Sequence, residues 1–202
     1  PRSPIPGSAM RASTRADLCP RGTPAIAGDL AFAFTGEGIL AAVRLTDGKL
    51  QWSHPVVNEL KGKPAEYGMA SSPLVVGDKV LVLVGAPKAT IAAYDTKTGK
   101  LAWTGGNDPA GYSSPTLLQV GGRSQVVVAT GNSIIGLDPA TGSLLWRHPY
   151  VTDFNCNIAT PLSVQGQVFV SSGENHGSVL LGLKPKGAGF DVEEVWTSLG
   201  PK

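Results

Sequence analysis

The side chains best suited to hold a metal ion are three oxygen-bearing residues in one short segment. Asp153, Asn155 and Asn157 alternate along the chain just before its last repeat. Carboxylate and amide oxygens are ligands that hard cations such as Ca²⁺ accept. A polar turn uses the same residue types, because Asp and Asn side chains bond to nearby backbone N–H groups. The segment is therefore a candidate metal site, and a polar turn is the favoured interpretation.

The histidines and cysteines occupy repeated positions that indicate packing. His54 and His148 each stand two residues after a tryptophan and directly before a proline, and Cys-x-x-Cys spacing for zinc is absent. Cys19 and Cys156 each precede a proline by five residues, where the other repeats carry Gly or Ala. A small packing residue is the favoured interpretation of this position. The alternative is a disulfide between the first and last repeats, which requires an oxidising compartment.

Composition excludes several classes of partner and site. The net charge is only +2 and the Lys and Arg residues are scattered, so we expect no nucleic-acid partner. No apolar run approaches the roughly 20 residues of a transmembrane helix, so we expect no membrane-spanning segment. Neither a Gly-x-Ser-x-Gly elbow nor a phosphate-binding loop ending in Gly-Lys-Ser/Thr is present.

A repeated segment must position all of these residues. AAYDTKTGKLAW at 92–103 returns as IGLDPATGSLLW at 135–146 and more loosely as AAVRLTDGKLQW at 41–52, and an altered copy fills 181–196. Every unit opens with a small residue and Pro, at positions 24, 73, 115 and 161. Each copy ends at one of the four tryptophans, which are Trp52, Trp103, Trp146 and Trp196. Such regular spacing predicts a repeated supersecondary unit.

The repeated unit predicts a four-stranded antiparallel sheet. Short Val-rich or alternating runs separated by Gly turns are typical of hairpin-connected strands. Four-stranded units of roughly 40–50 residues are typical of propeller blades. We predict an all-β propeller with about four blades, preceded by an irregular lead-in over residues 1–19. Within the repeat region 20–202, the predicted blades span about 22–55, 70–106, 112–149 and 158–198.

The alternation Ala-x-Asp-x-x-Thr-Gly-x-x-x-Trp resembles the signature of the PQQ-like, or quinoprotein-like, β-propeller repeat of secreted bacterial proteins. The resemblance implies that each Trp packs between neighbouring blades, beside a tight Thr-Gly turn. Gly permits positive φ in that turn, and Asp or Thr can bond its backbone N–H groups. We therefore expect the motif residues to be structural. They are Asp95, Thr98, Gly99 and Trp103, then Asp138, Thr141, Gly142 and Trp146, together with Trp52 and Trp196.

The resemblance also implies a ring with more blades than four, commonly about seven or eight. An open half-ring exposes apolar faces on its first and last blades, which is an aggregation hazard. Three arrangements remain open: a part of a larger propeller, a half-ring that dimerises, and a compact four-bladed ring. We favour the first, so the four blades are expected to form part of a seven- or eight-bladed ring.

Two functions are compatible with the resemblance. Quinoprotein dehydrogenases of this fold use an adjacent Cys-Cys disulfide, a stacking Trp, a Ca²⁺ site and an Asp base around PQQ. This chain has no Cys-Cys pair, and the repeat motif takes all four tryptophans. We therefore expect no catalytic residue and no cofactor, and a non-enzymatic periplasmic or extracellular propeller that binds a protein, a peptide or a second copy of the chain. The alternative is a PQQ- and Ca²⁺-dependent dehydrogenase, or a fragment or remnant of one.

Any specific site is expected where the repeat is interrupted. The interruptions are the connection at 53–69, the loop at 150–158 and the insertion at 174–190. Loops on a rigid scaffold carry function more often than the scaffold does.

Overall fold

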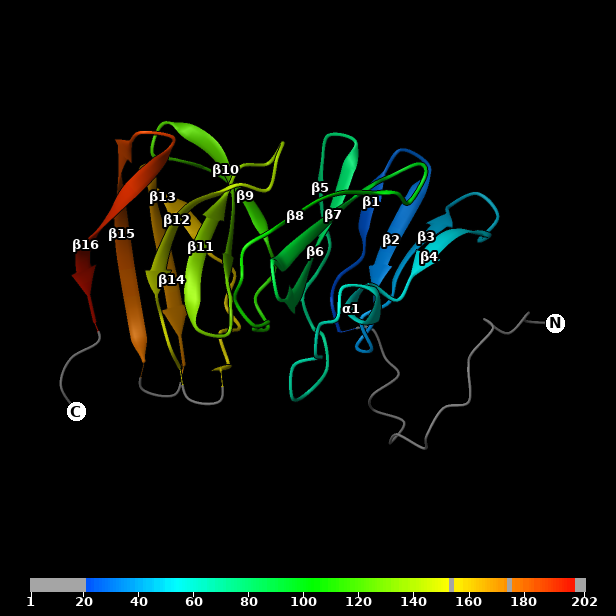
Figure 1. Cartoon of the computed structure of the whole chain (residues 1–202), viewed down its shortest axis with the longest axis horizontal. Coiled ribbons are helices and arrows are strands. Elements are labelled where there is room, and N and C mark those ends of the chain that lie inside the picture. Colours follow the sequence, from blue (N-terminus) through cyan, green and yellow to red (C-terminus); the bar gives the residue numbers. More distant parts are fainter. Residues whose placement is uncertain (1–20, 153–154, 174–175, 199–202) are drawn as a thin grey trace.

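The chain folds into four antiparallel β-sheets that follow one another along the sequence. The computed structural model describes residues 21–152, 155–173 and 176–198. Each sheet holds four strands in sequential order, so every blade is an up-and-down meander. The four sheets lie side by side, from blade 1 in blue to blade 4 in red (Figure 1). The predicted all-β fold of four-stranded antiparallel blades is confirmed.

The strand bounds show how closely the blades follow the repeat. Blade 1 comprises β1 (Ala25–Ala27), β2 (Leu30–Phe34), β3 (Leu40–Arg44) and β4 (Leu50–His54), and blade 2 comprises β5 (Leu74–Val76), β6 (Lys79–Ala86), β7 (Ala89–Asp95) and β8 (Leu101–Gly105). Blade 3 comprises β9 (Thr116–Val120), β10 (Arg123–Ala129), β11 (Ser133–Leu137) and β12 (Leu144–Pro149). Blade 4 comprises β13 (Leu162–Val164), β14 (Gln167–Ser172), β15 (Gly177–Lys186) and β16 (Gly189–Thr197).

One short helix, α1 (Val56–Glu59), follows blade 1 and lies in the connection that interrupts the repeat. Its two valines are fully buried, and it packs beside β6 of the next blade. No helix in the described ranges is long and apolar enough to cross a membrane.

The core is the packing of one blade on the next. In β6 the burial is continuous from Val80 to Val84, because blade 2 lies between two other blades. In β2 it alternates, with Phe32 and Phe34 buried but Ala31 and Ala33 partly exposed. Successive side chains of a strand point to opposite faces, so blade 1 is covered on one face only.

The repeated Asp-x-x-Thr-Gly motif closes the turn between the third and fourth strands. Asp95 Oδ1 accepts hydrogen bonds from the backbone N–H groups of Lys97 and Thr98, at 3.1 and 2.7 Å. The Gly99 N–H donates to the Asp95 carbonyl at 2.9 Å, and Gly99 has φ of 68°. The turn at Asp138 has the same bonds. The glycine gives the turn its positive φ, and the carboxylate adds bonds to the turn N–H groups; in blade 1 the same backbone bond runs from Gly48 to the Arg44 carbonyl without a carboxylate at that position.

Each of the first two motif tryptophans lies against the turn of the following blade. The indole of Trp52 donates from Nε1 to the Thr96 carbonyl at 3.0 Å. A Cβ placed on Gly99 would lie 2.8 Å from Cδ2 of Trp52, so the indole leaves no room for a side chain there. The ring of Trp103 covers Gly142 in the same way. The structure places these residues between neighbouring blades.

The third tryptophan turns back onto its own blade. Trp146 Nε1 donates to Oε1 of the buried Gln125 at 2.6 Å. The ring lies over Gly136, where a Cβ would collide with the indole, and this explains why Gly136 replaces the alanine of the motif. Blade 4 has no Thr-Gly turn to receive an indole, and Gly189 approaches the backbone at Leu145 instead.

The extra residues of the last repeat lengthen two strands. β15 and β16 pair from Val179 opposite Thr197 to Lys186 opposite Gly189, with a turn at Gly187. The insertion predicted at 174–190 is thus accommodated by longer strands, since 177–186 is the regular strand β15. Alternation cannot distinguish a longer hairpin from an insertion, because both can carry polar residues on an exposed face.

The two motif carboxylates make stability depend on pH. Hydrogen bonds from the Thr98 side chain and backbone lower the pKa of Asp95. Burial raises the pKa of Asp138, but the backbone and Thr141 hydrogen bonds of its turn, together with the nearby Arg123, outweigh this effect, so the pKa is lowered. A lowered folded-state pKa stabilises the fold above the unfolded pKa of about 4, and this contribution disappears as pH falls through the folded pKa.

We expect the stability difference between wild type and an Asp95→Asn/Asp138→Asn variant to shrink below about pH 4. Urea unfolding between about pH 7 and pH 2 measures both proteins. A difference that stays constant across this range contradicts the assignment.

Candidate functional site

The connections between blades gather on one edge of the molecule. α1 and the loop that follows it lie at the lower edge of the sheets in Figure 1. The segments that follow β8 and β12 contribute to the same cavities as this loop. We call this edge the loop face.

A cavity of about 430 Å³ lies where all four units meet on the loop face. Four of its lining residues stand three positions before an opening proline, at 24, 73, 115 and 161, so the repeat brings the same position of each unit to one place. We call this cavity the mouth. Its lining residues are Arg21, Tyr67, Ala70, Tyr112, Cys156 and Ile158.

Two tyrosines and an arginine give the mouth its geometry. The rings of Tyr67 and Tyr112 have centroids 6.2 Å apart at 41°, and the Tyr67 N–H donates to the Tyr112 hydroxyl at 3.1 Å. Arg21 Nη1 donates to the Tyr67 carbonyl at 2.5 Å. Burial raises the pKa of Tyr112, so its hydroxyl stays protonated near neutral pH and can donate to a ligand. The Tyr67 and Ile158 side chains are 57% and 65% exposed.

Neighbouring cavities extend the mouth into a groove with charges of both signs. A cavity of about 410 Å³ shares Tyr112 and is bordered by Lys61, Lys63 and Glu66. Another of about 370 Å³ shares Arg21 and Tyr67, and a third of about 340 Å³ shares Cys156 and Ile158. The arrangement is an apolar and aromatic centre with a polar border, which is typical of a surface that binds another polypeptide.

The predicted oxygen cluster is divided by the structure. Asn157 is buried, and its Nδ2 donates to the carbonyls of Thr130 and Tyr150 at 2.7 and 3.1 Å. Asn155 borders the groove, and Asp153 lies outside the described residues. Among the described residues there is no group of three or more His, Cys, Asp or Glu side chains that could hold a metal. A cation site at this segment therefore stays a prediction.

The histidines at repeated positions make contacts between blades. The ring of His54 stacks on Tyr94 of blade 2 with centroids 5.3 Å apart. His148 Nε2 lies 3.4 Å from Glu194 Oε1 of blade 4, and burial lowers the pKa of His148. Cys156 lines the mouth, but Cys19 lies outside the described residues, so their pairing stays a prediction.

A polar cluster between blades 2 and 3 was not expected from the sequence. The buried Asp108 carboxylate receives the Arg147 guanidinium, with Nη2 at 3.0 Å from Oδ1, and bonds to the Ser133 hydroxyl. The Asp108 N–H donates to Thr90 Oγ1 at 2.6 Å. A signal was available, because Arg147 is the one charged residue that follows a motif tryptophan.

None of the four tryptophans takes the place of the stacking tryptophan that the family resemblance implies for PQQ. Trp52 and Trp103 pack on turns, Trp146 lies over Gly136, and Trp196 is on the last strand of blade 4. None of them borders the mouth or the other cavities of the loop face given above. The stacking tryptophan that the family resemblance implies for PQQ is therefore not at these cavities, and no chemical step is derived through PQQ.

Comparisons with known proteins agree on the fold. A family model described as outer membrane protein assembly factor BamB matches residues 8–66 and 63–182. The chain is 36% identical over 98 residues to a tetrathionate hydrolase from Acidithiobacillus ferrooxidans, covering 46% of this chain and 18% of that protein.

Two solved structures share the fold at low sequence identity. BamB from Moraxella catarrhalis aligns with a TM-score of 0.57 and 20% identity, over 86% of this chain and 53% of that one. Quinohemoprotein alcohol dehydrogenase from Comamonas testosteroni aligns with a TM-score of 0.62 and 15% identity, over 90% and 35%. The chain thus spans about half the length of the first of these structures and less of the curated relative.

Proposed function

Because this chain belongs to the PQQ-like repeat family whose model is described as outer membrane protein assembly factor BamB, we propose that it is a non-enzymatic propeller that binds a polypeptide partner at the mouth. One observation carries the proposal: the same repeat position of all four units lines the mouth, and the mouth exposes aromatic and aliphatic side chains. The likeness to BamB supports an assembly role outside the cytoplasm.

The chemistry of the mouth favours an extended segment with apolar or aromatic side chains. Tyr67 and Ile158 expose large apolar surfaces that gain free energy when a partner covers them. The Tyr112 hydroxyl and the Arg21 guanidinium lie among them and can bond to a peptide backbone or carboxylate. Rigid aromatic side chains with a polar tip are common anchors in protein interfaces.

We expect Tyr67→Ala and Ile158→Ala each to weaken binding of a peptide chosen from a random library against the wild-type chain by about tenfold or more. The physical reason is the loss of an exposed anchor at the centre of the site. Leu101→Ala is the matched control, since Leu101 is 48% exposed on an outer strand away from the loop face. Titration with the labelled peptide measures all three. Equal affinities for the mouth and control variants contradict the proposal.

The dehydrogenase alternative has its own test. The fold likeness to quinohemoprotein alcohol dehydrogenase is the observation in its favour. Titrating the chain with PQQ and Ca²⁺ while following absorbance and dye reduction tests it. A saturable absorbance change with dye reduction supports the alternative and contradicts a purely binding role.

A further inference from the structure

The tryptophan of blade 4 and the glycine turn of blade 1 each lack the partner that the other blades provide. Trp196 of blade 4 is 45% exposed, whereas Trp146 is 3% exposed. At Gly48, in the turn of blade 1, a Cβ would meet nothing within 4 Å, whereas the same turn glycines Gly99 and Gly142 are covered by an indole. In the described part of the chain, blade 4 therefore has a tryptophan without a turn, and blade 1 has a turn without a tryptophan.

The face of blade 4 around Trp196 is apolar over β13 and β14, and towards the turn of β15 and β16 it carries the exposed ion pairs Lys184–Glu193 and Lys186–Asp191. Leu162 and Val164 of β13 are 56% and 42% exposed. Phe169 pairs with Leu162 across the sheet, and its ring packs on the Trp196 indole with centroids 6.0 Å apart. The residues that follow the opening proline at the same places in blades 1 to 3 are all partly buried, because a further blade covers them. The part of this face formed by β13, Phe169 and Trp196 therefore has the composition of a contact between blades.

The opposite face of blade 1 is uncovered in the same way. Ala31 and Val43 pair across β2 and β3 and are both partly exposed. The corresponding pairs in the later blades are at most 2% exposed because a preceding blade covers them; these pairs are Val80–Tyr94, Val126–Leu137 and Val168–Leu181.

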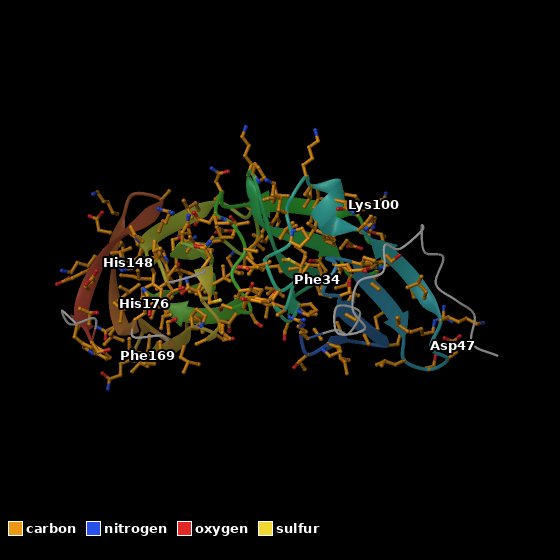
Figure 2. The ribbon with its side chains drawn as sticks, turned by 90° about the horizontal axis from the view of Figure 1, so that it is seen from below. Phe34, Asp47, Lys100, His148, Phe169 and His176 are labelled. Atoms are coloured by element: carbon orange, nitrogen blue, oxygen red, sulfur yellow. The ribbon has the colours of Figure 1, made fainter. Side chains whose placement is uncertain are left out.

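The two uncovered faces of one chain do not meet each other. Asp47, next to Gly48, and Phe169, next to Trp196, lie at opposite ends of the molecule (Figure 2). The blades thus form an open row, and the described structure does not adopt the compact four-bladed ring that the sequence left open.

We propose that blade 4 of one copy packs on blade 1 of a second copy, with Trp196 covering the Gly48 turn. The contacts of Trp52 with Gly99 and of Trp103 with Gly142 are the template for this interface. Used twice around a two-fold axis, the same contact closes two four-bladed copies into one ring of eight blades. A second copy is the occupant because each chain carries both halves of the contact.

The fold comparison is consistent with this closure. The chain aligns with about half of the solved BamB chain, so a second copy supplies as much propeller as the rest of that structure contains. Closure also covers the apolar faces of blade 1 and blade 4.

Light scattering of the full 202-residue chain across a range of concentrations tests the proposal. We expect the mass of a dimer for wild type, and a dissociation constant at least about tenfold higher for Trp196→Ser. Leu101→Ser is the matched control, because Leu101 is 48% exposed on the outer strand of an inner blade.

A second variant tests the other half of the contact. Gly48→Asn places a side chain where the indole would lie, in a backbone conformation that Asn tolerates. Gly77→Asn is its control, since Gly77 also has positive φ and nothing within 4 Å of a Cβ. We expect the first variant to weaken dimerisation and the second to leave it unchanged. If Trp196→Ser loses its fold by circular dichroism, Gly48→Asn carries the test.

Mixing the two variants distinguishes this interface from any other dimer. A Trp196→Ser chain still has an intact Gly48, and a Gly48→Asn chain still has an intact Trp196. Native mass spectrometry of an equal mixture is therefore expected to show more heterodimer than random pairing of the two chains gives, because one of its two contacts is complete.

Three results would overturn the proposal. They are a wild-type chain that is monomeric at every concentration, a dimer that both variants leave unchanged, and a mixture with no excess of heterodimer. A longer polypeptide that carries these residues gives a further test. If it is monomeric, and Trp196→Ser leaves its mass unchanged but lowers its stability, both faces belong to contacts with further blades of the same chain.

Discussion

Replacing Gly142 by alanine is expected to lower the free energy of unfolding by about 2–5 kcal/mol. Gly142 has φ of 73°, a left-handed conformation that costs an alanine about 1–2 kcal/mol. The new Cβ would also collide with the ring of Trp103, and such overpacking costs about 1–3 kcal/mol. Both effects disrupt the contact between blades 2 and 3, so a large part of the core is affected.

Gly77→Ala separates these two effects. Gly77 has φ of 60°, but a Cβ there would meet nothing within 4 Å. Gly77→Ala is therefore expected to lower the free energy of unfolding only by the backbone cost of about 1–2 kcal/mol. Urea unfolding at one fixed protein concentration measures both variants. Equal losses for Gly142→Ala and Gly77→Ala would show that the indole does not restrict the turn.

The second large effect is expected at the polar cluster between blades 2 and 3. Replacing Asp108 by alanine removes the acceptor of the Arg147 guanidinium and of the Ser133 hydroxyl. The carboxylate is buried, whereas the Arg147 side chain is 42% exposed and can regain water. We therefore expect a loss of about 2–4 kcal/mol, below the upper range for a fully buried pair.

Asp47→Ala provides the comparison with an exposed ion pair. Asp47 lies 3.3 Å from Arg44 on the open turn of blade 1, where such pairs contribute at most about 1 kcal/mol. A double-mutant cycle with Arg147→Gln then isolates the coupling of Asp108 with Arg147. A coupling indistinguishable from zero would show that the cluster is held by its other hydrogen bonds.

Local patterns were enough to predict the blades and their turns. Asp95, Thr98 and Gly99 act within five consecutive residues, so their chemistry predicts the turn without knowledge of distant contacts. The four opening prolines aligned the units in the same way. The motif also predicted a tryptophan between blades, which the structure shows for Trp52 and Trp103.

Contacts between blades were harder to predict, because they depend on the register of one sheet against the next. Asp108 and Arg147 are 39 residues apart and meet only when blades 2 and 3 are packed. The hydrogen bond of Trp146 was missed for a related reason, since its partner Gln125 lies on β10, which β11 separates from β12 in the same sheet.

Tyr67, Cys156 and Ile158 of the mouth lie in the interruptions of the repeat where a site was expected. Their meeting with residues of the other units was not predicted, because the mouth residues have unlike chemistry. Arg21, Ala70, Tyr112 and Ile158 share a repeat position but no property that a motif search detects. Their convergence follows from the arrangement of the four opening strands, which a linear sequence does not show.

The meander order of the strands has a consequence for synthesis on the ribosome. Every sheet is made of four consecutive strands, so its backbone hydrogen bonds need no residue from another unit. The Trp52 contact then requires only the turn around Gly99, which emerges about one repeat later. Blades can therefore form and dock in the order of translation, and a nascent chain has at most one unmatched tryptophan at a time.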